Sequence, residues 1–130
     1  MSFKSNLINI VLVETSHPGN IGSVARAMKT MGLSELSLVK PRKFPSGEAN
    51  ALSGNATDVL ENAKVFDSIE DAIKDSTFVY ATSSRSRTIQ WPTIHAEEGA
   101  SLINNQVSSN KKVSILFGRE DRGLTNEELQ

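Results

Sequence analysis

Short apolar runs alternate along the chain with segments in which apolar residues recur every three or four positions. The runs are rich in β-branched and aromatic residues, and they predict strands at residues 9–13, 36–39, 64–66, 77–81 and 113–117. The helical spacing predicts helices over residues 21–31, 55–63, 68–74 and 93–106. Ser68 and Asp71 have the spacing of a capping box, as do Thr125 and Glu128 near the end of the chain.

This order of elements predicts an α/β fold. Strands that are apolar on both faces and separated by helices indicate a parallel sheet that is covered by helices on both faces. A length of 130 residues, of which 38% are hydrophobic, suffices for one compact core, so we expect one domain. In such a sheet, ligands bind beyond the carboxyl ends of the strands, so the loops that follow strands are the candidate functional segments.

The composition narrows the chemistry. The absence of cysteine excludes disulfides, a thiolate nucleophile and cysteine-rich zinc sites. His17 and His95 are far apart with no acidic pair at ligand spacing, so we expect no metal.

No apolar run approaches the roughly 20 residues that span a bilayer, and residues 1–9 lack the layout of a secretory signal, so we expect a cytoplasmic protein without a membrane partner. The net charge of −1 means that any anionic partner must be recognised by a local patch.

All six arginines lie in loops that follow predicted strands or in the helix starts after those loops. Two lysines join them, and the candidate phosphate contacts are Arg26, Lys40, Arg42, Lys43, Arg85, Arg87, Arg119 and Arg122. The planar guanidinium group pairs with two phosphate oxygens at once, which suits a face that binds nucleic acid. The alternative is that these arginines only decorate surface loops.

The loop after the first strand reads SHPGNIGSVAR over residues 16–26. Pro18 and Gly19 predict a turn. Asn20 is a candidate N-cap residue, and Gly22 would let another backbone approach the first helical turn. The segment fits neither the dinucleotide-binding fingerprint nor the P-loop, so nucleotide cofactors of those classes have little support.

The helix predicted after this loop buries one face, which consists of Ile21, Val24, Ala25, Met28 and Met31. Counting 100° per residue from Ile21 puts Arg26 at about 140°, on the opposite side of the helix. The Arg26 side chain therefore lies either in solvent, as an ordinary surface arginine, or on a partner.

Three segments taken together resemble a known family. They are SHPGNIGSVARAMKTMGL, ATSSRSR and ILFGREDRGLTNEEL, and they resemble the SpoU branch of the SPOUT RNA methyltransferases, and more narrowly the TrmJ-type tRNA 2′-O-ribose methyltransferases. The first motif, N-x-G-x-x-x-R, falls on Asn20, Gly22 and Arg26. The second, F-G-x-E-x-x-G-L, falls on Phe117, Gly118, Glu120, Gly123 and Leu124. The pair is specific, and it stands in the family's order.

The resemblance implies a SPOUT-type α/β knot fold and S-adenosylmethionine as the cofactor, bound in loops at the carboxyl ends of the strands. The residues that it assigns to the cofactor are Thr82, Ser83, Ser84, Gly118, Glu120, Gly123 and Leu124. Arg26 would lie nearest the ribose 2′-hydroxyl, with Asn20 in support. A guanidinium group stays protonated in water and is a poor base there, so we favour a role in holding phosphate and hydroxyl and leave a role as base open.

The resemblance also implies partners. It predicts tRNA as the substrate, with nucleotide 32 of the anticodon loop as the target, and no metal. Family members work as homodimers in which the RNA-facing arginine and the cofactor come from different subunits.

The family's third motif would follow Gln130, so we expect residues 1–130 to be a C-terminally incomplete methyltransferase domain without the knot. Such a chain would bind the cofactor weakly or not at all and would show little or no activity. Two alternatives remain at this point. A non-catalytic RNA-binding module of the same fold would keep the arginines but not need Asn20 or Glu120. A flavodoxin-like or Rossmann-like enzyme would act on a small molecule without RNA.

Overall fold

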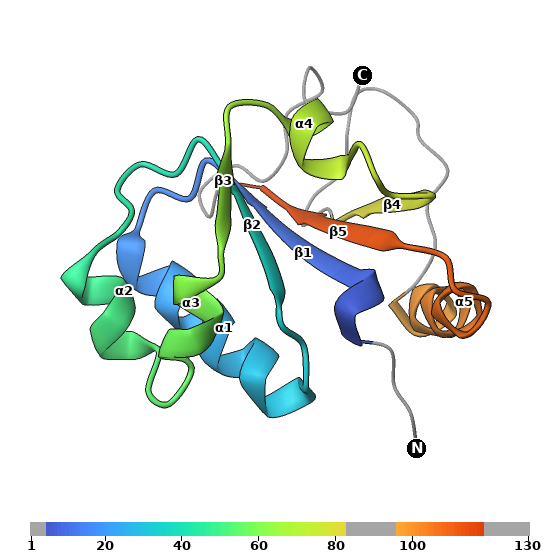
Figure 1. Cartoon of the computed structure of the whole chain (residues 1–130), viewed down its shortest axis with the longest axis horizontal. Coiled ribbons are helices and arrows are strands. Elements are labelled where there is room, and N and C mark those ends of the chain that lie inside the picture. The colour runs from blue at the N-terminus through green and yellow to red at the C-terminus, as the bar shows by residue number, and fades with distance from the viewer. Residues whose placement is uncertain (1–4, 83–95, 119–130) are drawn as a thin grey trace.

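The computed structural model describes residues 5–82 and 96–118, which are arranged around a parallel sheet (Figure 1). Within these residues, five strands pair in the order β3-β2-β1-β5-β4, and each neighbouring pair is parallel. The strands are β1 (Ile8–Val13), β2 (Glu35–Val39), β3 (Lys64–Phe66), β4 (Phe78–Ala81) and β5 (Val113–Phe117). The predicted parallel sheet is confirmed, and β3 and β5 have the predicted bounds.

The described helices are α1 (Pro18–Met31), α2 (Gly47–Leu52), α3 (Thr57–Glu61), α4 (Ile69–Ile73) and α5 (Ala96–Ser108), with a 3-10 helix η1 (Ser5–Leu7) before β1. The Ser68 Oγ accepts a hydrogen bond from the Asp71 N–H at 3.1 Å, which confirms Ser68 as the cap of α4. The helix predicted over 55–63 is shorter, and α2 was not predicted, because its sequence GEANAL is too short to show helical periodicity.

The strand order explains where the helices lie. From β1 through β2 to β3 the chain moves toward one edge, and from β4 back to β5 it moves in the same direction. The connection from β3 to β4 is the only one in the described sheet that moves the opposite way. Because crossovers between parallel strands are right-handed, the helices on the three connections that move the same way (β1 to β2, β2 to β3 and β4 to β5) lie on one face, and α4 lies on the other (Figure 1).

The face that carries α1, α2, α3 and α5, here called the α1 face, holds the larger core. Alternate residues of β1 point into it, and they pack with the buried side of α1 and with residues from each of the other three helices. The core consists of Ile8, Ile10, Leu12, Ile21, Ala25, Met28, Leu33, Leu36, Leu38, Ala49, Ala56, Val59, Leu60, Val107 and Val113.

The opposite face, here called the α4 face, has a smaller apolar cluster that consists of Val11, Val13, Val39, Ala72 and Leu116. Three polar residues are buried in the strands on this face: Asn9, Ser37 and Ser114. The prediction of strands that are apolar on both faces was therefore wrong for this face at those three positions.

The buried stripe of α1 also departs from the prediction at its end. Met31 is 61% exposed, although Ile21, Ala25 and Met28 are buried as expected. Gly32 ends α1 in the left-handed conformation with φ 77°, and the Leu33 N–H then donates to the Met28 carbonyl oxygen at 2.8 Å. This turn brings Leu33 into the core in place of Met31.

Candidate functional site

The loop after β1 forms the start of α1 differently from the sequence prediction. His17, and not Asn20, is the N-cap residue, and Pro18 is the first helical residue. Proline suits this position because its fixed φ is already helical and its missing N–H needs no partner there. Asn20 lies in the first turn with its side chain exposed, so its amide group faces solvent rather than capping the helix.

Arg26 is exposed on the side of α1 that faces away from the core, as the helical count predicts. In the part of the chain that the structure describes, no hydrogen bond or ion pair to the Arg26 guanidinium group is found. A guanidinium group without a protein partner keeps its donors for a phosphate or a hydroxyl.

Gly22 is the point at which α2 approaches α1. A Cβ atom placed on Gly22 would lie 2.0 Å from the Ala49 carbonyl oxygen. Every other residue would collide with this backbone, so the predicted close approach at Gly22 is confirmed. The first motif thus includes a packing residue, Gly22, as well as the candidate functional residues Asn20 and Arg26.

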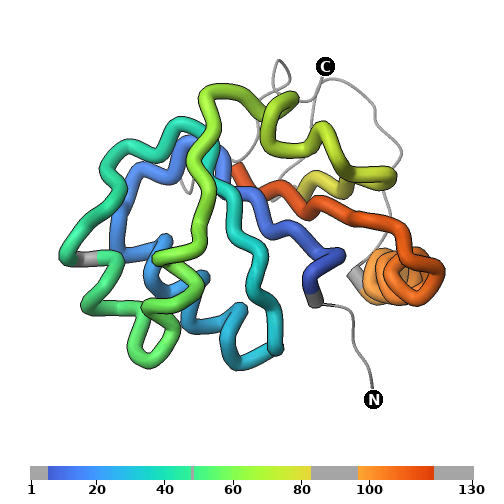
Figure 2. Tube along the Cα trace, in the orientation of Figure 1, coloured from blue at the N-terminus to red at the C-terminus, as the bar shows by residue number. Residues whose placement is uncertain are grey.

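The loop after β2 is joined to the loop after β1 and to the carboxyl end of β3. The Arg42 N–H donates to the Thr15 carbonyl oxygen at 3.2 Å, and the Lys40 N–H donates to the Phe66 carbonyl oxygen at 3.0 Å. Figure 2 shows the first two loops running side by side. These bonds place the exposed side chains of Lys40, Arg42 and Lys43 beyond the carboxyl end of the sheet.

In the half of the sheet that ends with β4, Thr82 and Gly118 follow the adjacent strands β4 and β5. The Thr82 N–H and the Thr82 Oγ1 both donate to the Leu116 carbonyl oxygen, each at 3.0 Å. The structure therefore brings these two predicted cofactor residues to the same end of the sheet. The other predicted residues lie outside the described residues: Ser83, Ser84, Arg85, Arg87, Arg119, Glu120, Arg122, Gly123 and Leu124.

The described site residues thus form two groups. The first group consists of Asn20, Arg26 and the cations Lys40, Arg42 and Lys43, and it lies in the half of the sheet with β1, β2 and β3. The second group consists of Thr82 and Gly118, and it lies in the half with β5 and β4, where β4 is separate from α1 in Figure 1. Within the described part of one chain, Arg26 and the Thr82 hydroxyl are not brought together.

One neighbour of Arg26 was missed by the sequence prediction. Gly54, in the turn between α2 and α3, has φ 59°, and a Cβ atom there would lie 3.8 Å from both the Cδ and the Nε of Arg26. The residues SGN at positions 53–55 are typical of a turn, although the helix predicted over residues 55–63 starts within them. No local pattern could link this turn to Arg26.

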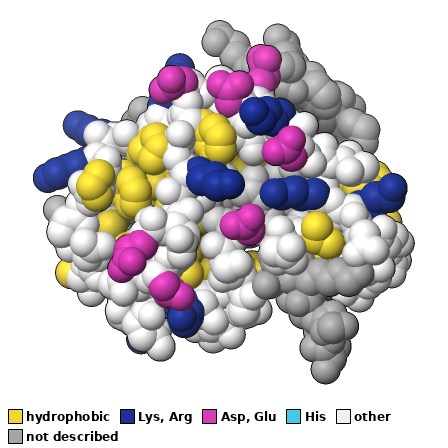
Figure 3. All heavy atoms as spheres, in the orientation of Figure 1, with side chains coloured by type: hydrophobic (Ala, Val, Ile, Leu, Met, Phe, Trp, Pro, Cys, Tyr) yellow, Lys and Arg dark blue, Asp and Glu magenta, His cyan; other side chains and the backbone are white. Residues whose placement is uncertain are grey.

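Charges near α1 are mostly solvated. The Lys29 ammonium group donates to the Asp58 carboxylate at 2.8 Å and so joins α1 to α3. This hydrogen bond, followed by the charge of Lys29, lowers the pKa of Asp58 below its ordinary value. On the face shown in Figure 3, basic and acidic side chains of the described residues are interspersed, so a phosphate contact there must be local.

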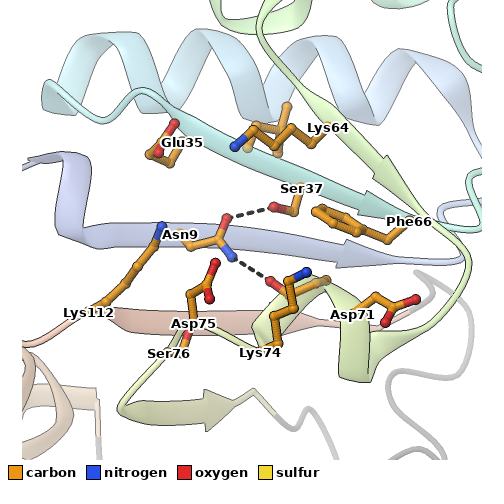
Figure 4. Close-up of a pocket in the computed structure, with 12 residues that line it drawn as sticks. Asn9, Glu35, Ser37, Lys64, Phe66, Asp71, Lys74, Asp75, Ser76 and Lys112 are labelled. Carbon is orange, nitrogen blue, oxygen red and sulfur yellow. Dashed lines mark hydrogen bonds between the residues drawn. The ribbon is translucent and has the colours of Figure 1, made fainter.

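A cavity of about 300 Å³ lies on the α4 face, near the amino ends of the strands (Figure 4). Asn9 and Ser37 line its base, and the charged side chains around it include Lys64, Lys74 and Asp75. None of the predicted site residues that the structure describes lines it. Among the described residues, no group of histidine and acidic side chains could hold a metal ion. The helices in that part of the chain are also too short or too polar to cross a membrane.

Comparison with known proteins gives a consistent result. Residues 7–130 match the SpoU rRNA Methylase family. The tRNA (cytidine/uridine/adenosine-2′-O-)-methyltransferase TrmJ of Pseudomonas aeruginosa is 51% identical over 123 residues, which cover 95% of this chain and 48% of that protein. The chain spans about half the length of the curated relatives that it matches.

Solved structures agree with this match. A probable methylase family protein from Haemophilus influenzae is 49% identical with a TM-score of 0.86, over 95% of this chain and 51% of that one. TrmJ from Z. mobilis is 38% identical with a TM-score of 0.86, over 93% of this chain and 53% of that one.

Proposed function

Because the chain belongs to the SpoU rRNA methylase family, we propose that the complete protein transfers a methyl group from S-adenosylmethionine to a ribose 2′-hydroxyl of tRNA. The observation that carries this proposal is the 51% identity over 95% of the chain to a protein named as a tRNA 2′-O-methyltransferase. We place the target at nucleotide 32 of the anticodon loop.

Arg26 supplies the main contact to RNA in this proposal. Its guanidinium group is exposed, and it can pair with a phosphate and donate to the attacking ribose oxygen at the same time. Methyl transfer needs this oxygen to be aligned about 3 Å from the methyl carbon, so a donor that holds the oxygen contributes by orientation. Asn20 supports the contact from the first turn of α1. The cations after β2 and the other predicted arginines hold the flanking phosphates.

The described residues after β4 and β5 fit the cofactor. S-adenosylmethionine presents donors in its adenine amino group, its ribose hydroxyls and its ammonium group. The Thr82 hydroxyl already donates to the Leu116 carbonyl oxygen, so its lone pairs remain for accepting from such a donor. Gly118 next to it offers backbone groups without a side chain. The bound cofactor would supply an electrophilic methyl group and leave as S-adenosylhomocysteine, and the ribose hydroxyl would release its proton to solvent, so the reaction needs no metal.

We further propose that the complete protein is a homodimer in which Arg26 of one protomer faces Thr82 and Gly118 of the other. The separation of the two groups within one chain supports this arrangement. A two-fold axis repeats each interface contact, so one dimer would contain two such sites.

The test is mass-spectrometric mapping of ribose methylation in tRNA after incubation with S-adenosylmethionine and the complete protein. We expect methylation by the wild type, and its loss with Arg26→Ala. Lys29→Ala is the matched control, because it removes an exposed positive charge three residues along the same helix. If the wild type binds tRNA without methylating any nucleotide, the protein is a non-catalytic RNA-binding module.

A further inference from the structure

Arg26 lies beside a turn from a distant part of the chain. The turn comprises residues 53–56, between α2 and α3, and its ends are anchored in the core. Ser53 and Ala56 are both 0% exposed, and the Ala56 N–H donates to the Ser53 carbonyl oxygen at 3.0 Å. The Ser53 Oγ donates to the Asn50 carbonyl oxygen at 2.8 Å. These bonds fix the turn, with Gly54 exposed between its anchored ends.

The position of this turn follows from Gly22. Residues four apart lie on the same side of a helix, so Gly22 and Arg26 share one side of α1. Gly22 lets the backbone of Ala49 in α2 approach to a distance that no side chain would permit. The chain that leaves α2 then passes one turn further along α1, where it reaches Arg26. The contact at Gly22 and the contact at Gly54 are therefore two consecutive parts of one packing arrangement.

Because Gly54 has no side chain, the space beside Arg26 stays open at this position. Its φ of 59° is in the left-handed region, and its nearest neighbours are the Cδ and the Nε of Arg26. A Cβ atom alone would touch them at an ordinary van der Waals distance of 3.8 Å. Any longer side chain would reach into the space along the arginine, and an acidic one would reach its guanidinium group.

We propose that Gly54 is a positioning residue for Arg26, because its missing side chain keeps the guanidinium group clear of protein partners and directed toward RNA. The proposal rests on the proposed function only for the identity of the ligand, which is a tRNA phosphate or hydroxyl. It adds the turn of residues 53–56 to the RNA site, although no motif marks this segment.

The test compares Gly54→Asp with Gly54→Asn in the complete protein. Both residues tolerate a left-handed backbone and have nearly the same size, so strain affects both variants equally. Only aspartate can form an ion pair with Arg26 and withdraw it from RNA. We expect Gly54→Asp to weaken tRNA binding about ten-fold relative to Gly54→Asn, with a higher KM for tRNA and an unchanged KM for S-adenosylmethionine.

Gly32 provides the matched control. It also has a positive φ, 77°, but nothing lies within 4 Å of a Cβ atom placed there. Gly32→Asp and Gly32→Asn should therefore bind tRNA equally well. If the two Gly32 variants differ as much as the two Gly54 variants, a general effect of negative charge explains the result and the proposal is overturned.

A double-mutant cycle on tRNA binding separates withdrawal of Arg26 from simple repulsion of RNA. With Arg26→Ala in place, Gly54→Asp should cause little further loss. A full additional ten-fold loss would overturn the proposal. A wild type that binds tRNA but methylates none would refute the proposed function, and a strong coupling in the cycle would still support the role of Gly54.

Discussion

The two faces of the sheet differ in how they are packed, and the difference explains where function can reside. The α1 face carries four of the described helices over a continuous apolar core, whereas α4 alone of those helices covers the other face. The right-handed crossovers produce this inequality, because the single reversed connection places α4 by itself. Arg26 and the turn of residues 53–56 lie on the well-packed face.

Buried polar side chains on the α4 face are joined by hydrogen bonds. Asn9 donates to the Ala72 carbonyl oxygen at 3.2 Å and to the Ser114 Oγ at 3.1 Å, and it accepts from the Ser37 Oγ at 2.7 Å. The Ser114 hydroxyl is in turn hydrogen bonded to that of Ser76. This network joins three strands to α4 and to the loop after it. The packing of the α4 face therefore includes directional hydrogen bonds, whereas the packing of the α1 face rests on the complementary shapes of apolar side chains.

The largest effect that we predict tests the close packing of the α1 face. Gly22→Ala places a Cβ atom against the Ala49 carbonyl oxygen, so α2 must move away from α1. We expect a loss of about 3 kcal/mol in the free energy of unfolding, measured with denaturant. Gly47→Ala is the control, because nothing lies within 4 Å of a Cβ atom there, and its stability should be unchanged or slightly raised. Equal stability of the two variants would contradict the close approach.

The second prediction tests the polar network of the α4 face. Asn9→Ala leaves the buried Ser37 hydroxyl and the Ala72 carbonyl oxygen without this partner, and Ser114 keeps only its hydrogen bond to Ser76, so we expect a loss of about 2 to 3 kcal/mol. Replacing Asn9 by Val together with Ser37→Ala and Ser114→Ala removes the two buried hydroxyls that lost a hydrogen bond, so much of the stability should return. Denaturant unfolding of both variants measures this. A triple variant as unstable as Asn9→Ala would show that the network is not the cause.

The sequence predicted one face better than the other for a physical reason. The run NIVLV identified β1, and the spacing of Gly22 identified a close approach, because both signals are local. The roles of Asn9 and Ser37 depend on the pairing of distant strands, so each looked like an isolated polar residue within an apolar run. The start of α1 was misplaced by three residues because Pro18 was interpreted as part of a turn.

For the candidate site, too, the sequence predicted local features but not contacts between distant residues. The exposure of Arg26 followed from helical geometry, and the position of Thr82 and Gly118 followed from the parallel sheet. Gly54 and Arg26 are 28 positions apart, and they come close because of α2, a helix too short to show helical periodicity in the sequence. Tertiary contacts of this kind have no signature in a single sequence.

The third prediction compares the two faces with one residue type. Val113 on the α1 face and Val11 on the α4 face are both 0% exposed. We expect Val113→Ala to cost about 2 kcal/mol and Val11→Ala about 1 kcal/mol, because a short helix such as α4 can settle into the space that is left. Unfolding in denaturant gives both values. An equal or reversed order would mean that the two faces are equally rigid.

The smallest effect concerns the ion pair that joins α3 to α1. Lys29 lowers the pKa of Asp58 below its ordinary value of 3.8, so the folded state favours the ionised carboxylate. The stabilisation is complete above the pKa of the unfolded chain and is lost as the pH falls through the lower pKa of the folded protein. Because both groups are exposed, the contribution is small, and added salt should weaken it further. Measured against the wild type, Lys29→Ala should be less stable at pH 7 in low salt and equally stable at pH 2. A difference that persists at pH 2 would come from the apolar stem of Lys29, and α3 would then be held to α1 by packing alone, as the rest of that face is.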